Sequence, residues 1–352
     1  MMRARALVLL ALFPCALHAQ GTQGDYIARD FKFSTGDALP ELRLHYTTLG
    51  TPQRDAAGLV RNAVMILHGT GGTGRSFLSA TYAGELFGPG KLLDTARYYI
   101  VLPDGIGHGG SSKPSDGLHA RFPKYTYDDM VRAQQLLLTK GLGVNHLRLV
   151  MGTSMGCMHA WVWGYTFPDF VDGLVPQACV PAPIVGRNRM MRKMIMDDIR
   201  NDPAWQGGEY TEQPKGVIAA SQLLFMMTSA PLVQHRQAPT REAADSAIVA
   251  YLAARVRVTD ANDMLYQFDA SRDYDPSGHL AQVTTPVLAI NSADDLVNPP
   301  ELGIMERLMP QVAKGTFILL PISAQTRGHG THSVPTVWGE HLSAFLKTLP
   351  QR

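Results

Sequence analysis

The sequence has little net charge and no apolar run long enough to cross a membrane. Its 352 residues carry a formal charge of +2 at pH 7. Without a basic surplus, neither nucleic acid nor an anionic membrane surface is expected as a partner. Internal repeats and low-complexity tracts are also missing. We therefore expect a ligand that is small or neutral.

Cysteine is scarce as well, with three in the whole chain. Cys15 lies close to the N-terminus, which leaves Cys157 and Cys179 for the body of the protein. These two could form one disulfide in an oxidising compartment. We favour two buried thiols, and the pairing stays open on sequence grounds.

The N-terminal stretch has the pattern of an export signal. Arg3 and Arg5 precede a short apolar run over residues 6–12, and small or polar residues follow as far as Ala19. The run is too short to span a bilayer. We predict a signal peptide over residues 1–19, cleaved near Ala19, and a periplasmic or secreted protein.

Apolar segments then alternate with helical ones. Residues 41–49 alternate apolar and polar side chains, which favours an antiparallel edge strand. Continuous apolar runs, typical of parallel strands covered on both faces, lie at 63–67, 98–102 and 147–151, and later strands are expected at 173–176, 287–290 and 316–320. This rhythm predicts an α/β fold with a mostly parallel, doubly wound sheet.

Residues 183–275 break the rhythm, because they contain no clear strand and many helix formers. We predict a helical lid there, inserted into a sheet core formed by residues 20–182 and 276–352. The lid is rich in methionine: Met190, Met191, Met194, Met196, Met226 and Met227. We expect these to be packing residues; a flexible apolar wall for a substrate pocket is the alternative.

A nucleophile motif follows the apolar run at 147–151. Residues 152–156 are Gly-Thr-Ser-Met-Gly, which is G-x-S-x-G ahead of a helical stretch at 157–167. Small residues on either side of the serine let strand and helix approach closely, and the helix N-terminus adds a positive dipole end. We predict that Ser154 is the nucleophile.

A glycine-rich loop, His-Gly-Thr-Gly-Gly at 68–72, follows the run at 63–67. The expected oxyanion-hole donors are the backbone N–H groups of Thr70 and of Met155, the residue after the serine. The phosphate-binding signature G-x-x-x-x-G-K-[ST] is missing, which argues against a phosphate loop. We expect His68 to brace the loop.

The acid should follow the serine in chain order and the base should follow the acid. Asp294 and Asp295 come directly after the strand expected at 287–290. We prefer Asp295, which lies four residues before Pro299, and Asp294 is the alternative.

The predicted base is His329, which stands between two glycines after the strand expected at 316–320. His332 is the reserve candidate. A third ligand at a sensible spacing is missing, so we predict no metal site. Ser154, Asp295 and His329 together predict chemistry through an acyl-enzyme.

These motifs resemble the homoserine O-acetyltransferase family of the α/β-hydrolase superfamily. Residues 152–156 are similar to that family's G-G-S-M-G elbow, residues 202–210 (DPAWQGGEY) to its D-P-x-W-x-G-G-x-Y segment, and residues 260–266 (DANDMLY) to its D-x-N-x-x-L-Y segment. Asp295 and His329 fall where the family's acid and base fall. The resemblance implies an α/β-hydrolase fold with an inserted helical lid and a homodimer formed through that lid. We expect no cofactor.

Departures from that family favour hydrolysis. Residues 107–114 (GHGGSSKP) differ from its G-G-x-x-G-S-T-G-P-like loop, and the Tyr-Arg pair that would help to bind an amino-acid carboxylate is missing near 226–230. An exported protein also meets water rather than acetyl-CoA, which is cytosolic. We predict a serine hydrolase that cleaves a small, short-acyl carboxylic ester; the alternative is an O-acyltransferase of the homoserine acetyltransferase type that uses an alcohol acceptor.

Overall fold

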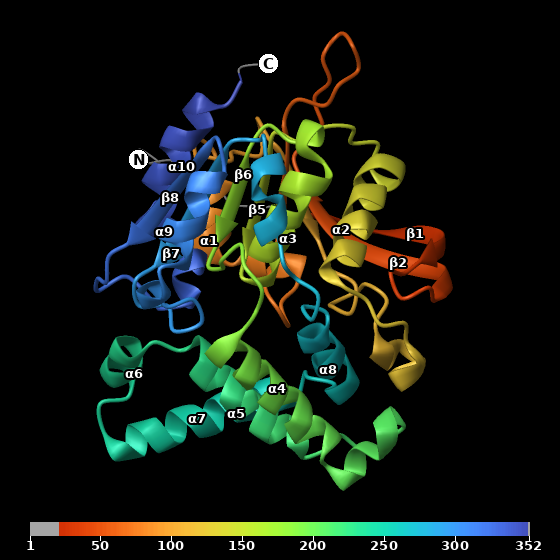
Figure 1. The fold of residues 1–352 in the computed structure, drawn as a ribbon, viewed down its shortest axis with the longest axis vertical. Helices are drawn as coiled ribbons and strands as arrows, with labels where there is room; N and C mark the ends of the chain where they lie inside the picture. The colour runs from red at the N-terminus through yellow and green to blue at the C-terminus, as the bar shows by residue number, and fades with distance from the viewer. Residues whose placement is uncertain (1–20, 351–352) are drawn as a thin grey trace, which may run out of the picture.

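The computed structural model describes residues 21–350, so the predicted signal peptide lies outside the described residues. In this part of the chain an eight-stranded sheet carries helices on both faces, and a further helical layer lies below it in Figure 1. The strands are β1 (Thr22–Lys32), β2 (Ala38–Leu49), β3 (Ala63–Leu67), β4 (Tyr99–Pro103), β5 (Leu149–Thr153), β6 (Leu174–Gln177), β7 (Val287–Ser292) and β8 (Gly315–Leu320). The helices are α1 (Ala80–Leu86), α2 (Tyr127–Leu136), α3 (Met155–Thr166), α4 (Gly186–Arg200), α5 (Gly216–Thr228), α6 (Pro231–Gln237), α7 (Arg241–Val256), α8 (Ala261–Asp269), α9 (Ile304–Leu308) and α10 (Pro335–Thr348).

The strand order is β1-β2-β4-β3-β5-β6-β7-β8. β2 pairs antiparallel with β1 and with β4, and every other neighbouring pair is parallel. The predicted runs fall within two residues of the observed strands except at the start of β2, which begins three residues earlier than predicted, and β3, β4 and β5 are buried along their whole length. The predicted α/β fold with a mostly parallel, doubly wound sheet is confirmed.

Alternate side chains of the central strands belong to two apolar layers. On β3, Met65 and Leu67 join the layer that contains α2 and α3, whereas Val64 and Ile66 join the layer that contains α1 and α10. Each strand therefore needs apolar residues on both sides, which explains why its sequence is a continuous apolar run.

One edge of the sheet differs from the prediction. Residues 41–49 lie in β2, which is an interior strand, because β1 pairs along its outer side from Thr22 opposite Thr48 to Lys32 opposite Ala38. Most side chains of β1 are exposed or half-buried. A strand that buries so few side chains leaves no apolar run in the sequence, so β1 escaped the prediction.

In the sequence, the helices α4 to α8 come between β6 and β7. They form the helical layer below the sheet in Figure 1, and we refer to this layer as the lid. The methionines of this layer fall into two sets. Met191, Met196 and Met227 are buried, whereas Met190, Met194 and Met226 are exposed. Packing therefore explains only the first set. Among residues 21–350 no single helix is long and apolar enough to cross a membrane, although α5 and α6, bent by 106° at their junction, reach the length and composition of a span together.

Candidate active site

Ser154 occupies the sharp turn between β5 and α3. Its backbone has φ 54° and ψ −111°, a region that residues with a side chain rarely adopt. Its N–H donates to the carbonyl oxygen of Gln177 on β6 at 2.9 Å. The neighbouring strand thus holds the strained turn in place, and the serine sits where β5 ends.

Gly152 and Gly156 permit this turn because backbone atoms pass too close for a side chain. A Cβ at Gly152 would lie 1.9 Å from the carbonyl oxygen of Gly156. A Cβ at Gly156 would lie 2.1 Å from the carbonyl oxygen of Leu67, at the end of β3. A larger residue at either position would push α3 away from the sheet, so the G-x-S-x-G spacing is a packing requirement here.

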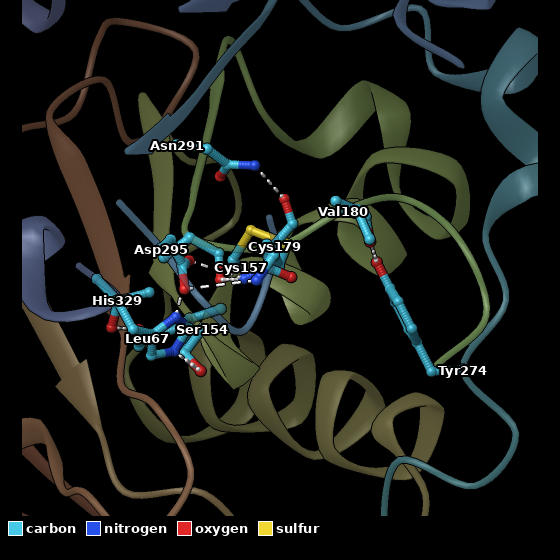
Figure 2. The surroundings of a disulfide bond; sticks show 12 residues. Leu67, Ser154, Cys157, Cys179, Val180, Tyr274, Asn291, Asp295 and His329 are labelled. Carbon is cyan, nitrogen blue, oxygen red and sulfur yellow. Dashed lines mark hydrogen bonds and ion pairs between the residues drawn. A yellow bond between two sulfur atoms is a disulfide. The ribbon is translucent and has the colours of Figure 1, made fainter. Parts of the chain in front are cut away.

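A chain of hydrogen bonds runs from the serine to a buried carboxylate (Figure 2). Nε2 of His329 lies 2.9 Å from Oγ of Ser154, and Nδ1 of His329 lies 2.9 Å from Oδ2 of Asp295. A carboxylate can only accept, so Nδ1 carries the proton and Nε2 is left to accept from the serine hydroxyl. The structure therefore brings together the three residues that we predicted as nucleophile, base and acid.

Asp295 is fixed from several directions. Besides His329, it accepts the N–H of Val297 at 2.8 Å and the side-chain amide of Asn298 at 3.0 Å. Burial raises the pKa of Asp295, but the charge and hydrogen bond of His329, with the bonds from Asn298 and Val297, outweigh it and hold that pKa below its ordinary value. The carboxylate of Asp295 is therefore ionised and can accept the hydrogen bond from Nδ1 of His329.

The two reserve candidates occupy other places. Asp294 accepts the N–H of Gly328 at 2.9 Å and the hydroxyl of Ser292, so it holds the loop that carries His329. The ring of His332 lies 5.8 Å from that of His329, centre to centre. Burial, together with the charge of His329, lowers the pKa of His332 to about 3. Its imidazole is neutral at physiological pH.

The loop after β3 lies against the start of α3. The N–H of Gly156 donates to the carbonyl oxygen of His68 at 3.0 Å, and a Cβ at Gly69 would lie 3.2 Å from the Cβ of Ser154. Met155 is the first residue of α3, where an N–H has no helical acceptor. Within residues 21–350, the N–H groups of Thr70 and Met155 form no backbone hydrogen bond. Thr70 lines the same cavity as Ser154, and Met155 follows the serine in the chain, so both residues predicted to supply oxyanion donors lie close to it.

His68 braces the glycine-rich loop, as predicted. Its Nδ1 lies 2.9 Å from the carbonyl oxygen of Gly69, and its Nε2 accepts the N–H of Gly105 at 2.9 Å. Burial lowers the pKa of His68, which keeps the ring neutral. His108 is buried beside it, with the ring centres 5.0 Å apart. His68 borders the larger cavity beside Ser154, but both of its ring nitrogens are taken by backbone groups, so it is not placed to act as an acid or a base.

Cys157 and Cys179 form a disulfide, which corrects our expectation of two free thiols (Figure 2). Cys157 lies in the first turn of α3 and Cys179 lies just after β6, with their Cα atoms 5.9 Å apart. The pair meets because α3 packs back against the end of β6, a contact that the spacing of 22 residues does not reveal.

The disulfide secures the segment 178–180, which lies next to the serine. Side-chain hydrogen bonds hold the same segment: Asn298 donates to the carbonyl of residue 178 at 3.0 Å, Asn291 to that of residue 179 at 3.0 Å, and Tyr274 to that of residue 180 at 3.1 Å. Figure 2 shows the last two of these bonds near the sulfur bridge, that of Asn291 above it and that of Tyr274 to its right. The wall of the site is therefore anchored to β7, to the acid loop and to the end of the lid.

In the described part of the chain, two cavities meet at the serine. The larger, of about 360 Å³, lies between the glycine-rich loop and the lid helices α5 and α8. The smaller, of about 70 Å³, lies between the segment 178–185 and the loop after β7. Ser154, Arg192, Val297 and His329 line both. A substrate can therefore place one part on each side of the serine oxygen.

Two residues of this site escaped the sequence prediction. Asn298, three residues after Asp295, carries a local signal, because an amide so close to the acid can reach its carboxylate. No local sequence signal marks Arg192, because α4 holds several basic residues and only the folded structure shows which one is buried.

Comparisons with known proteins agree with this geometry. A family model described as alpha/beta hydrolase fold matches residues 62–317. A probable acyltransferase of Methanothermobacter thermautotrophicus is 27% identical over 80% of this chain and 86% of its own length. The homoserine O-acetyltransferase of Geotalea daltonii is 34% identical over 54% of each chain, so the match spans about half the length of such curated relatives.

Solved structures give the same fold. A homoserine O-acetyltransferase from Bacillus anthracis superposes with a TM-score of 0.80 at 23% identity, over 93% of this chain and 98% of its own. The esterase E22 superposes with a TM-score of 0.79 at 20% identity, over 92% of this chain and 99% of its own. At such low identity these likenesses establish the fold alone.

Proposed function

Because the chain belongs to the α/β-hydrolase fold family, we propose that it is a serine hydrolase that cleaves a small, short-acyl carboxylic ester. One observation carries the proposal: the chain of hydrogen bonds from Asp295 through His329 to Ser154, which ends where two cavities meet. A serine so placed has a base within reach and room for both halves of an ester.

The proposed reaction begins when Ser154 Oγ attacks the ester carbonyl and Nε2 of His329 takes the serine proton. Asp295 holds Nδ1–H and stabilises the imidazolium, while the N–H groups of Thr70 and Met155 donate to the oxyanion. The oxyanion then collapses, the ester C–O bond breaks, and His329 gives its proton to the leaving alcohol. An acyl-enzyme on Ser154 remains.

Water resolves that acyl-enzyme in the second half of the proposed reaction. His329 takes a proton from the water as its oxygen attacks the acyl carbonyl. The second oxyanion collapses with the proton returning to Ser154, so the acid leaves and the enzyme is restored. The protein residues required are the same in both halves, and we propose no cofactor.

Two features support water as the acceptor. The predicted signal peptide would take the protein away from cytosolic acetyl-CoA, and the disulfide between Cys157 and Cys179 suits an oxidising compartment. We therefore propose that the protein acts in the periplasm or outside the cell.

The second candidate is an O-acyltransferase that passes the acyl group to an alcohol. The likeness to a probable acyltransferase over most of that protein's length favours it. Chemically the two functions share the acyl-enzyme and differ only in what attacks it. The fold likenesses do not choose between them, because one solved structure is an acetyltransferase and the other an esterase.

The deciding experiment gives the purified protein p-nitrophenyl acetate, with and without excess acetyl-CoA and homoserine, and uses Ser154→Ala as the control. The hydrolase proposal predicts release of p-nitrophenol that needs no acceptor and disappears in the variant. Release that requires homoserine and yields its acetyl ester would establish the transferase instead. Equal release of p-nitrophenol by the wild type and by Ser154→Ala would overturn both the hydrolase and the transferase.

A further inference from the structure

A buried arginine borders the space around the nucleophile. Arg192 is only 3% exposed, and it lines both cavities together with Ser154 and His329. It comes from α4 in the lid, whereas the serine and the histidine come from the core. The arginine therefore belongs to the substrate-facing wall and not to the chain of hydrogen bonds behind the serine.

Neutral groups hold the guanidinium. Its Nε donates to the side-chain oxygen of Asn188 at 2.9 Å, and one terminal nitrogen donates to the hydroxyl of Ser271 at 3.1 Å. The carbon of the guanidinium lies 5.5 Å from the ring centre of Phe268. These contacts fix the position and direction of the group, but none of them cancels its charge.

Within residues 21–350, no acidic side chain forms an ion pair with Arg192. Other arginines of the protein behave differently: Arg148 pairs with Asp172 and Arg272 pairs with Asp269. Proteins rarely bury a charge without a partner, because the lost hydration is costly. A buried, unpaired cation on the wall of a cavity is therefore a place for an anionic part of a ligand.

We propose that Arg192 binds a carboxylate carried by the ester, so that the enzyme prefers anionic esters to neutral ones of the same shape. The planar guanidinium suits a carboxylate, which it can hold through two parallel hydrogen bonds. Asn188, Ser271 and Phe268 hold it in place beforehand, so binding orders little that was free. This inference rests on the proposed ester hydrolysis at Ser154, and it narrows the sequence expectation of a small or neutral ligand to a small, anionic one.

The carboxylate can belong to either half of the ester, because Arg192 lines both cavities. Two matched pairs of substrates separate these cases. Monoethyl succinate and ethyl succinamate differ by a carboxylate or a carboxamide on the acyl side. Acetoxyacetate and acetoxyacetamide differ in the same way on the alcohol side.

The first test compares kcat/KM within each pair. We expect the carboxylate to be favoured about 10- to 100-fold in at least one pair, the range for a hydrogen bond to a charged group. Arg192→Met should bring that ratio close to one. Arg192→Lys keeps the charge but lacks the two parallel donors of the guanidinium, so its ratio should lie between those of the wild type and Arg192→Met. Arg200→Met removes an exposed arginine from the same helix and should leave the ratio unchanged.

A wild-type ratio near one in both pairs would overturn the inference, and so would an unchanged ratio in Arg192→Met. Arg192→Lys carries the same test if the methionine variant does not fold. A purely structural arginine would lower the activity on both members of a pair together, so the ratio separates that role from recognition.

The second test measures binding without turnover. Calorimetry on Ser154→Ala, with monoethyl succinate against ethyl succinamate and acetoxyacetate against acetoxyacetamide, should show at least about tenfold tighter binding of one carboxylate. Adding Arg192→Lys should reduce that difference. If neutral esters are hydrolysed but no carboxylate binds more tightly, the inference fails and the proposed function stands. If a carboxylate binds more tightly but no ester is cleaved, the proposed function fails and the carboxylate site stands.

Discussion

The helices α3 and α7 have opposite surroundings. α3, which starts directly after Ser154, has buried residues at ten of its twelve positions, from Met155 to Gly164, whereas α7 in the lid has no buried residue among its sixteen. α6, also in the lid, has none either. The core thus surrounds the helix that follows the reacting serine, while part of the lid lies on the surface.

This difference separates two tasks. The core holds Asp295, His329 and Ser154 within hydrogen-bond distance of one another, which chemistry at a single atom requires. The lid contributes walls and one charged group, Arg192, which act on the substrate rather than on the serine. We therefore expect substitutions in the core to change turnover and those in the lid to change selectivity.

The largest effect is expected from Asp295→Asn, which leaves the shape of the acid but removes its charge. Because His329 then loses the partner that fixes its tautomer, kcat for p-nitrophenyl acetate should fall about 10³- to 10⁴-fold. Asp294→Asn is the matched control, since its carboxylate holds only the neighbouring loop, and its kcat should fall less than about tenfold. Equal losses in the two variants would contradict the assignment of the acid.

The comparison of these two aspartates also shows which features of the site can be predicted from the sequence. The strand runs, the elbow and the position of His329 were predictable because each depends on a few neighbouring residues. The choice of Asp295 over Asp294 rested on its distance to Pro299, and the structure supplies the physical reason, a hydrogen bond to the histidine.

Features that depend on distant contacts were missed. Two cysteines 22 residues apart meet only because α3 returns to the end of β6, so the disulfide was wrongly predicted as two thiols. β1 was missed because most of its side chains are exposed or half-buried, so its sequence holds no apolar run. Arg192 was missed because burial distinguishes it from the other basic residues of α4.

The next largest effect concerns the disulfide in the core. Replacing both Cys157 and Cys179 by alanine should lower the free energy of unfolding by about 3 kcal/mol, because the unfolded chain is no longer closed into a loop. KM should rise more than kcat falls, since the bridge secures the wall segment 178–180. Urea unfolding and steady-state kinetics measure both. Unchanged stability in the double variant, in oxidising buffer, would show that the bridge contributes nothing.

A smaller, pH-dependent effect is expected where the lid meets the core. Asp263 on α8 accepts the N–H of Ser115 at 2.9 Å and its hydroxyl at 2.6 Å, and burial raises the pKa of Asp263 to about 6. A carboxyl whose pKa is higher in the folded state stabilises the fold at low pH, and this contribution disappears as pH rises from about 4 to about 6. It is worth between about 1 and 3 kcal/mol.

Asp263→Asn should therefore flatten the change in unfolding free energy between pH 4 and pH 6 relative to the wild type, as measured by urea unfolding at each pH. Asp245→Asn, at an exposed position of α7, is the control and should follow the wild-type curve. If the unfolding free energies of Asp263→Asn and the wild type changed with pH in parallel, the contribution of Asp263 to the pH-dependent contact between lid and core would be contradicted.

The smallest effect is expected on the surface of the lid. Met194 is 52% exposed, so Met194→Gln should change the free energy of unfolding by less than about 0.5 kcal/mol. Urea unfolding at several protein concentrations measures it. A larger loss that grows with concentration would show that a second copy covers this methionine, as the homodimer expected through the lid would do.

The most direct test of the central claim is to locate the nucleophile. The protein is treated with a fluorophosphonate, digested and examined by mass spectrometry, with Ser154→Ala and Asp295→Asn treated in parallel. Our account predicts a single adduct on Ser154, formed more slowly in Asp295→Asn and absent in Ser154→Ala. An unlabelled wild-type protein, or an adduct on another residue, would contradict the claim that Ser154 is an activated nucleophile.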